Sequence, residues 1–342
     1  MQSKAKILLI YTGGTIGMMK DFETGALKAF NFGKLLQKIP ELKQLDCDIE
    51  TVSFDKPIDS SNMNPEEWIK ITTIIEDNYV NFDGFVVLHG SDTMSYSASA
   101  LSFMLENLSK PVIFTGSQLP IGDLRTDAKE NLITAIQIAS LQMDGKPAIR
   151  EVCLYFEYKL YRGNRTTKIN SENFNAFISP NYPTLIESGV HLKSFSELFL
   201  PKTRAKKLRI HKKFENNVAI VKIFPGISEA VLSAIFLIPQ LKGIVLETYG
   251  AGNGPTEEWF LTLLKGGIAR GLHIVNVTQC SIGSVTMGKY ETSTSMKEIG
   301  VISGKDITTE AAITKLMYLL GENVPANIFK TIFETSLRGE LS

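Results

Sequence analysis

LLIYTGGTIG, at residues 8–17, is the stretch that decides how this chain folds. An apolar run typical of a strand enters a turn with two adjacent glycines, and the hydroxyl of Thr15 follows just past the strand's end. Ligands of open α/β sheets bind at that edge, and glycines let backbone N–H groups approach a ligand closely. Gly-rich turns are also common without any catalytic role, so Thr15 is a candidate nucleophile that needs further support. A dinucleotide fingerprint fits poorly, because Thr12 stands where G-x-G-x-x-G needs its first glycine.

Similar apolar runs recur along the first half of the chain and alternate with helical patterns. Near-continuous apolar strands separated by helices indicate a mostly parallel sheet that is covered on both faces. We expect strands at residues 6–11, 84–89, 111–117 and 151–156, with helices at 65–78, 94–108 and 127–142.

Residues 196–217 interrupt this alternation, because they are basic and lack apolar periodicity. Beyond them we expect strands at 218–224, 243–248 and 272–278 and helices near 228–238, 256–269, 308–321 and 325–336. The pattern predicts a two-domain α/β protein. Its parts are a larger N-terminal domain with a mostly parallel sheet at 1–195, a linker at 196–217, and a smaller C-terminal α/β domain at 218–342.

The composition narrows the class of protein. A length of 342 residues is enough for two domains with sizeable cores. Lysine plus arginine and aspartate plus glutamate each number 36, so no basic excess indicates a nucleic-acid partner. The three cysteines form no C-x-x-C pair and the four histidines form no H-E-x-x-H motif. We therefore expect a protein without a metal, a cofactor or a disulfide framework.

The N-terminal sequence MQSKAKILLIYTGG has only five apolar residues after its two lysines, fewer than a secretory signal needs. No stretch approaches the ~20 apolar residues of a membrane-spanning helix. We therefore expect a cytoplasmic protein without a membrane partner. The motifs G-x-S-x-G and G-x-x-x-x-G-K-[ST] do not occur, which disfavours an α/β-hydrolase and a P-loop enzyme.

Two polar segments follow predicted strands, as Thr15 does. HGSDT at 89–93 ends the strand at 84–89 and precedes a helix. Asp92 and backbone N–H groups would therefore face the crevice, where a helix N-terminus favours anions. Serine, aspartate and threonine are also ordinary helix caps, and that alternative remains open. TGSQ at 115–118 ends the next strand in the same way.

Two further segments could complete a site. YRGNRTTK at 161–168 ends in Lys168, and a lysine beside Asp92 could be desolvated and help to deprotonate a hydroxyl. Otherwise Lys168 is an exposed loop residue. DSSN at 59–62 precedes a helix that starts near Pro65, and it offers short polar groups for a zwitterion or simply a turn and a cap.

Taken together, these segments resemble the bacterial type I L-asparaginases, the cytoplasmic branch of the asparaginase/glutaminase family. The resemblance runs from the first strand to LRGEL at 337–341. It implies the two-domain asparaginase-like fold, hydrolysis of the small-molecule substrate L-asparagine to L-aspartate and ammonia, and a homo-oligomer that is a dimer or a tetramer. The matching stretches are YTGGTIGM (11–18), DSSNM (59–63), DGFVVLHGSDTM (83–94), LSFMLENLSKPVIFTGSQLP (101–120), YRGNRTTK (161–168), TYGAGNGP (248–255) and VTQC (277–280).

The resemblance implies catalytic roles for four residues. Thr15 resembles the nucleophilic threonine of the family's first motif, and Ser91, Asp92 and Lys168 resemble its hydroxyl–carboxylate–lysine group. Amide hydrolysis needs a hydroxyl nucleophile, a proton relay and N–H donors at the developing oxyanion, and these turns can supply all three.

The resemblance also implies which residues bind the substrate. Asp59 and Ser60 resemble the groups that hold the α-carboxylate and α-amine, and Ser91 and Asp92 contribute to the same pocket. Holding the zwitterionic end in this way would fix the amide at attack distance.

Two departures from the family pattern concern the reaction. Ser91 stands where the family usually has threonine, which keeps the hydroxyl but loses a stiff β-branched side chain. We expect function to persist with looser positioning. Ala26 stands where the family's lid loop carries a tyrosine, an assignment that depends on one inserted residue. The nearby Phe22 and Phe30 have no hydroxyl, so Tyr290 or a water would have to assist the nucleophile.

A third departure concerns regulation. In the allosteric type I enzymes, an arginine at the position of Glu247 helps to hold a second asparagine. A glutamate there repels the carboxylate of that effector instead. We therefore expect no more than the remnant of an effector site, at Thr167, Glu247, Asn253 and Cys280.

Three other functions remain open. An amidotransferase-type subunit that releases ammonia for a tRNA-linked reaction would share the fold, but the archaeal relatives carry an additional N-terminal domain, whereas the catalytic strand here begins by residue 6. A nicotinamide-dependent oxidoreductase lacks its first fingerprint glycine. A non-catalytic amino-acid sensor would keep the pocket, and ammonia release on mixing with asparagine separates it from an enzyme.

Overall fold

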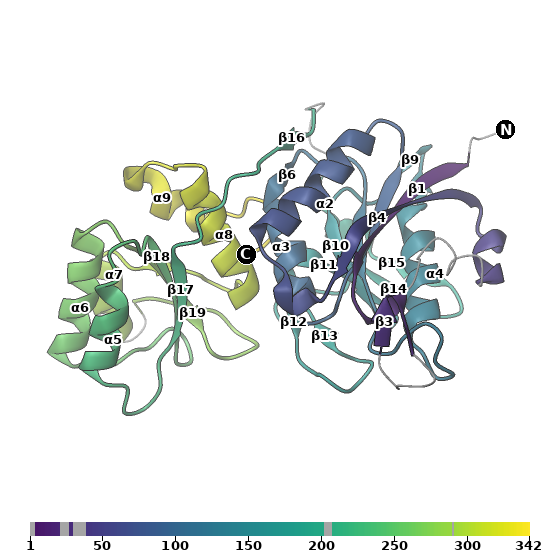
Figure 1. The fold of residues 1–342 in the computed structure, drawn as a ribbon. Helices are drawn as coiled ribbons and strands as arrows, with labels where there is room; N and C mark the ends of the chain where they lie inside the picture. The colour runs from purple at the N-terminus through teal and green to yellow at the C-terminus, as the bar shows by residue number, and fades with distance from the viewer. Residues whose placement is uncertain (1–3, 21–26, 30–38, 202–206, 289–290) are drawn as a thin grey trace. The chain divides into compact units, whose positions relative to one another are not determined.

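The computed structural model describes residues 4–20, 27–29, 39–201, 207–288 and 291–342. Contacts between residues divide the chain into two compact units, at 1–211 and 212–342. The boundary between the units falls inside residues 196–217, the segment proposed as a linker. Each unit contains a main sheet of its own (Figure 1).

The first unit is built on an eight-stranded sheet with the order β15-β14-β11-β10-β7-β5-β1-β4. The strands from β10 to β4 pair in parallel, and β11, β14 and β15 pair antiparallel. The parallel part contains all four strands predicted for this half of the chain, so the expected mostly parallel sheet is confirmed. The strands are β1 (Ala5–Gly13), β4 (Cys47–Ile58), β5 (Gly84–Leu88), β7 (Val112–Thr115), β10 (Val152–Phe156), β11 (Lys159–Arg162), β14 (Ile186–Ser188) and β15 (Leu192–Ser194).

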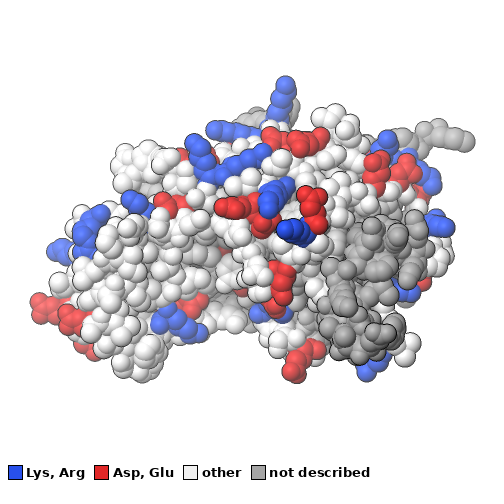
Figure 2. All heavy atoms as spheres, in the orientation of Figure 1, with Lys and Arg blue, Asp and Glu red and all other residues white. Residues whose placement is uncertain are grey.

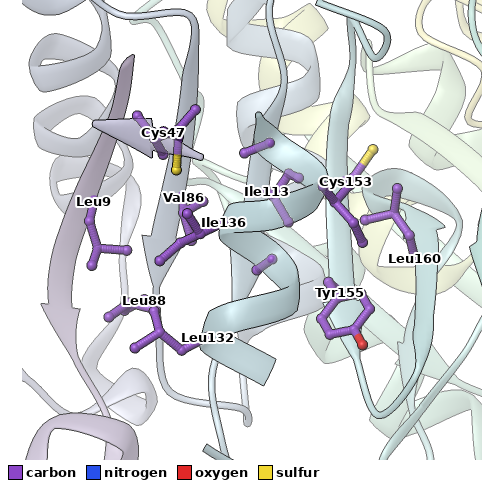
Figure 3. Close-up of a cluster of buried hydrophobic side chains, with 14 of the residues drawn as sticks. Leu9, Cys47, Val86, Leu88, Ile113, Leu132, Ile136, Cys153, Tyr155 and Leu160 are labelled. Atoms are coloured by element: carbon purple, nitrogen blue, oxygen red, sulfur yellow. The ribbon is translucent and has the colours of Figure 1, made fainter. Parts of the chain in front are cut away.

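Helices cover this sheet and explain why its central strands are apolar throughout. Figure 3 shows Leu9, Val86 and Ile113 of neighbouring strands meeting Leu132 and Ile136 of α4. On β7 and β10 the sheet also packs against α3, and α2 packs against α3. A central strand between two helical layers exposes neither face, which removes the alternation of polar and apolar residues. The helices are α2 (Pro65–Asn78), α3 (Met94–Met104) and α4 (Ala128–Ala139).

Two helices are shorter than predicted, and β4 was not predicted at all. The helix expected at 94–108 ends at Met104, and the helix expected at 127–142 ends at Ala139, because each gives way to a short strand, β6 or β8. β4 forms the edge of the sheet, and for this reason many of its side chains are exposed. The strand also contains Pro57. Edge strands tolerate proline and charges, and they lack the continuous apolar run that marks a central strand.

The short elements of the first unit complete its loops. β2 pairs with β3, β6 with β16, β8 with β9 and β12 with β13. These strands are β2 (Met18–Lys20), β3 (Leu27–Ala29), β6 (Leu105–Glu106), β8 (Gln142–Met143), β9 (Lys146–Pro147), β12 (Thr167–Lys168), β13 (Phe177–Ile178) and β16 (Arg209–Ile210). The 3-10 helices are η1 (Thr15–Gly17), η2 (Pro40–Gln44), η3 (Ser60–Asn62), η4 (Gly163–Arg165) and η5 (Ser196–Leu198).

The second unit has a parallel four-stranded sheet in the order β17-β18-β19-β20. Its three longer strands were predicted, and β20 was not, because two residues give no readable pattern. Serine and threonine cap two of its helices, as Ser228 accepts from Val231 N and Thr308 from Ala311 N. The elements are β17 (Val218–Lys222), α5 (Glu229–Phe236), β18 (Gly243–Thr248), α6 (Glu258–Ala269), β19 (His273–Thr278), α7 (Glu291–Glu298), β20 (Ile302–Ser303), α8 (Thr309–Gly321) and α9 (Ala326–Phe333).

Among the described residues of both units, no helix has the length and apolar character that a membrane span needs.

A fully buried ion pair fastens the C-terminal segment to α8. Lys315 Nζ donates to a carboxylate oxygen of Glu340 and to the carbonyl oxygens of Phe333 and Thr335, the latter two at 2.6 and 2.7 Å. Glu340 also accepts from Arg338 N at 2.7 Å. Burial lowers the pKa of Lys315, and the carboxylate of Glu340 opposes that effect. Each charge of this pair therefore stabilises the other in a place that solvent does not reach. Figure 2 shows that side chains of both charges are scattered over the visible face of the molecule.

Replacing Lys315 by methionine should lower the free energy of unfolding by about 3–5 kcal/mol, because it leaves a buried carboxylate without its cation. Urea unfolding measures this loss. The matched control is Lys4→Met, which breaks an ion pair to Asp46 whose side chains are 57% and 90% exposed. That change should cost less than about 1 kcal/mol. Similar losses of unfolding free energy for both variants would show that the buried pair stabilises the protein no more than the exposed pair does.

Candidate active site

Three turns meet at the carboxyl ends of the adjacent parallel strands β4, β1 and β5. Gly14 has φ +83°, and a Cβ atom on it would lie 2.5 Å from Gly90 N. A Cβ atom on Gly90 would lie 2.5 Å from Ser60 Oγ, and one on Gly13 would overlap the backbone of Ile58. Glycine is therefore required where the turns touch. This close packing brings together the turns that carry Thr15, Ser60 and Ser91.

Thr15 begins η1 directly after the glycine turn and is half-buried. No hydrogen bond holds its hydroxyl among the described residues. The strand end beneath it is fixed, because Thr12 Oγ1 donates to the Leu88 carbonyl oxygen of β5 at 2.9 Å. Thr15 thus combines a fixed backbone with a hydroxyl that no described residue engages.

The structure brings Ser91, Asp92 and Lys168 together, although 76 residues separate Asp92 from Lys168. Lys168 Nζ donates to Ser91 Oγ at 2.8 Å and to Asp92 Oδ1 at 2.7 Å. The Lys168 side chain is only 16% exposed, whereas that of Asp92 is 65% exposed. A mostly buried ammonium therefore contacts a hydroxyl and a carboxylate at the mouth of the site.

Buried serines of α3 hold the loop that carries Lys168, a contribution that sequence reasoning missed. Thr166 Oγ1 donates to the Gly163 carbonyl oxygen at 2.8 Å and therefore accepts from Ser95 Oγ at 3.0 Å, and Asn164 Nδ2 donates to Ser102 Oγ at 3.1 Å. The signal was present, because serines seven residues apart on a helix lie on one face. Because buried hydroxyls need hydrogen-bond partners, such a pair of serines indicates a neighbouring segment with polar groups.

Asp59 and Ser60 lie at the end of β4, on the other side of β1 from Ser91. Ser61 donates to Asp59 Oδ1 through its backbone N at 2.9 Å and its hydroxyl at 2.7 Å, and these bonds hold the pKa of Asp59 below its usual value. Ser60 is buried, and Thr93 Oγ1 donates to its carbonyl oxygen at 2.7 Å. An ionised carboxylate at this place suits a positively charged amine.

His89 is a fully buried neighbour of the site to which the sequence assigned no role. Its Nδ1 donates to the Gly90 carbonyl oxygen at 2.7 Å, its ring packs edge-on against Phe114, and its Nε2 has no hydrogen-bond partner within the described chain. Burial lowers the pKa of His89 to about 4. The imidazole is therefore neutral at physiological pH and fixes the carbonyl of the turn before Ser91.

His89 should make the protein less stable as the pH falls from about 6.5 to 4. The unfolded chain binds a proton at His89 in this window and the folded chain does not, so the free energy of unfolding falls by about 2 kcal/mol between pH 6.5 and 5 from this group. Urea unfolding at pH 7 and 5 should show a smaller loss for His89→Gln than for the wild type. His191→Gln, which changes an exposed histidine, should keep the wild-type loss. Equal losses in all three proteins would contradict the burial effect.

Three of the four residues proposed as an effector-site remnant lie in the second unit, in or after neighbouring parallel strands. Glu247 is in β18, Asn253 follows β18, and Cys280 follows β19 and is exposed. Thr309 Oγ1 donates to Glu247 Oε1 at 2.7 Å. The fourth, Thr167, is in β12 of the first unit.

The lid assignments fall on residues without a described structure. Ala26, Phe22, Phe30 and Tyr290 lie outside the described residues, so the lid remains a prediction. Across the described ranges, no group of three or more histidine, cysteine, aspartate or glutamate side chains is arranged to hold a metal ion.

Comparisons with known proteins identify the same family along both halves of the chain. A family model described as "Asparaginase, N-terminal" matches residues 6–198, and one described as "Glutaminase/Asparaginase C-terminal domain" matches residues 217–333. The chain is 42% identical to L-asparaginase 1 of Escherichia coli strain K12, with 100% of this chain and 99% of that protein covered. It is 31% identical to a glutamyl-tRNA(Gln) amidotransferase component of Pyrococcus abyssi, with 98% of this chain and 77% of that protein covered.

The fold agrees with the sequence comparison. The crystal structure of L-asparaginase I from Vibrio cholerae matches with a TM-score of 0.91 at 39% identity, and 99% of each chain is covered. The predicted two-domain α/β fold is therefore confirmed. Since the two family models together cover most of its length, the chain belongs to the asparaginase family.

Proposed function

We propose that this protein hydrolyses L-asparagine to L-aspartate and ammonia. The observation that carries the proposal is the contact of Lys168 Nζ with both Ser91 Oγ and Asp92 Oδ1, at 2.8 and 2.7 Å. This group lies beside the turn that presents Thr15, and the relatives named above include proteins called L-asparaginase.

In the proposed reaction, Thr15 Oγ1 attacks the side-chain amide carbonyl of asparagine. Lys168, as the free amine, takes the hydroxyl proton on its nitrogen lone pair while its N–H groups contact Ser91 Oγ and Asp92 Oδ1, and the ammonium so formed then protonates the leaving nitrogen. Ammonia departs and leaves an ester on Thr15. Water hydrolyses that ester, which releases aspartate and restores the hydroxyl. Thr15 is preferred over Ser91 as the nucleophile because Ser91 Oγ donates its proton to Gln118 Oε1, an amide oxygen that does not serve as a general base.

The remaining proposed residues bind the amino-acid end of the substrate. Asp59 and Asp92 supply negative charge for the α-amine, and the turns at Ser60 and Ser91 supply polar groups for the α-carboxylate. Strand ends on both sides of β1 thereby hold one small zwitterion. Fixing that end orients the amide toward Thr15 and removes much of the entropy cost of the attack.

An ammonia-release assay tests this function. The purified protein is mixed with asparagine, and separately with glutamine, over a range of concentrations and without RNA or any added protein. Release from asparagine is expected. Binding of asparagine without ammonia would instead favour the amino-acid sensor, and release only after a tRNA-bound partner is added would favour the amidotransferase.

We also propose a cytoplasmic homo-oligomer, either a dimer or a tetramer. The second unit exposes large apolar side chains on and near α5, which a second copy of the chain could cover. They are Phe224, Val231, Leu237 and Ile238. Light scattering coupled to size exclusion measures the mass in solution, and a monomer would contradict this part of the proposal.

The initial rate of the protein should depend hyperbolically on asparagine concentration, without strong cooperativity. Glu247 places a carboxylate where a cation would be needed to hold the carboxylate of a second asparagine. A ligand shifts a conformational equilibrium only by its differential affinity for the two states. Initial rates over several decades of asparagine concentration check this expectation. A sigmoidal curve that substitutions around Glu247 abolish would show that the chain does hold an effector.

A further inference from the structure

Gln118, which follows β7, contacts the hydroxyl of Ser91. Gln118 Oε1 lies 3.2 Å from Ser91 Oγ, and Gln118 Nε2 donates to the Asn173 carbonyl oxygen at 3.0 Å. The carbonyl partner identifies Nε2 as the amide nitrogen, so the atom facing Ser91 is the oxygen. An amide oxygen only accepts hydrogen bonds, and the Ser91 hydroxyl must therefore be the donor.

Lys168 fixes the other side of the same hydroxyl. An ammonium group only donates, so Ser91 Oγ accepts the bond from Lys168 Nζ at 2.8 Å. One donor and one acceptor thus define both the rotamer of Ser91 and the direction of its proton. Serine needs such help because it lacks the β-methyl group that restricts χ1 in threonine.

The backbone on which Gln118 sits is itself anchored. Gln118 N and Leu119 N donate to the carboxylate of Asp127, at 2.9 and 3.1 Å, and Thr126 Oγ1 donates to the Leu119 carbonyl oxygen at 3.2 Å. The amide oxygen is therefore presented to Ser91 from a fixed loop.

We infer that Gln118 is a positioning residue for the proposed reaction, in which its amide oxygen holds Ser91 in the rotamer that accepts from Lys168. The inference rests on the proposed function. Gln118 acts through Ser91, so its loss should impair the proton relay more than substrate binding. A β-methyl group at position 91 would supply much of the same restriction and should make Gln118 dispensable.

The test compares Gln118→Met in the wild-type protein and in the Ser91→Thr protein. In the wild-type protein, kcat should fall about five- to tenfold, in keeping with one lost hydrogen bond, while KM changes less than about twofold. In the Ser91→Thr background, whatever its own rate, Gln118→Met should lower kcat less than about twofold. Each kcat is compared with that of its own parent.

Thr126→Val is the matched control, because it loosens the same loop without touching Ser91. Its effect on kcat should be equal in the two backgrounds. Equal falls for Gln118→Met in both backgrounds, or an effect confined to KM, would overturn the positioning role while leaving the proposed function intact. A wild-type protein that releases no ammonia from asparagine would overturn the proposed function and this inference with it.

Discussion

Thr15→Val should lower kcat for asparagine by a factor on the order of 10³ or more, because removal of a nucleophile eliminates the covalent route. Valine has nearly the shape of threonine, so the glycine turn and η1 should keep their structure. Ammonia release measures kcat, calorimetry with aspartate shows whether the pocket still binds, and thermal unfolding reports the fold. We expect binding and fold to persist while turnover disappears.

Thr12→Val provides the matched control for this prediction. It makes the same chemical change three residues earlier and removes the hydrogen bond from Thr12 to the Leu88 carbonyl oxygen. The loss should appear as lower stability, with kcat reduced less than about tenfold, because one buried hydrogen bond contributes about 1 kcal/mol. If Thr15→Val kept more than about a tenth of the wild-type turnover, the nucleophile would have to be another group.

The central strands and the turns after them could be predicted because their physics is local. β5 is apolar throughout and β1 is apolar from Ile7 to Tyr11, because these stretches are buried on both faces, and each strand ends in a glycine-containing turn followed by a hydroxyl residue. Parallel strands place their carboxyl ends at one edge, so the sequence already indicates that Thr15 and Ser91 share that edge. The grouping of Lys168 with Asp92 was implied by the family resemblance, because the residues alone also allowed an exposed loop lysine, and the structure places the two at 2.7 Å.

Other features escaped prediction because their physics is not local. β4 is an edge strand with exposed polar residues, so its pairing with β1 is visible only once β1 is placed. The contact between Ser95 and Thr166 and the contact between Ser91 and Gln118 join residues far apart in the sequence. Serine, threonine and glutamine are ordinary surface residues, and even where the spacing of serines on a helix indicates polar partners, nothing in the sequence identifies those partners.

Asp92 and Lys168 should behave as one catalytic unit in a double-mutant cycle. Lys168→Met and Asp92→Asn should each lower kcat by about 10²- to 10⁴-fold, the usual contribution of general acid–base groups. The double variant should be little worse than the poorer single variant, because the proton relay is already broken once either member is lost. Ammonia release from all four proteins gives the coupling.

The exposed ion pair of Lys4 and Asp46 makes this cycle interpretable. Its Nζ–Oδ1 distance is 3.1 Å, and its two residues directly precede β1 and β4, at the ends of these strands opposite to the candidate site. Lys4→Met and Asp46→Asn, alone or together, should leave kcat within about twofold of the wild type, since a surface pair contributes at most about 1 kcal/mol and only to stability. Losses at Asp92 and Lys168 that multiply in the double variant would show two independent roles. Because Lys168 Nζ contacts both the Asp92 carboxylate and the Ser91 hydroxyl, we expect instead that losing either the lysine or the carboxylate disables the same proposed step.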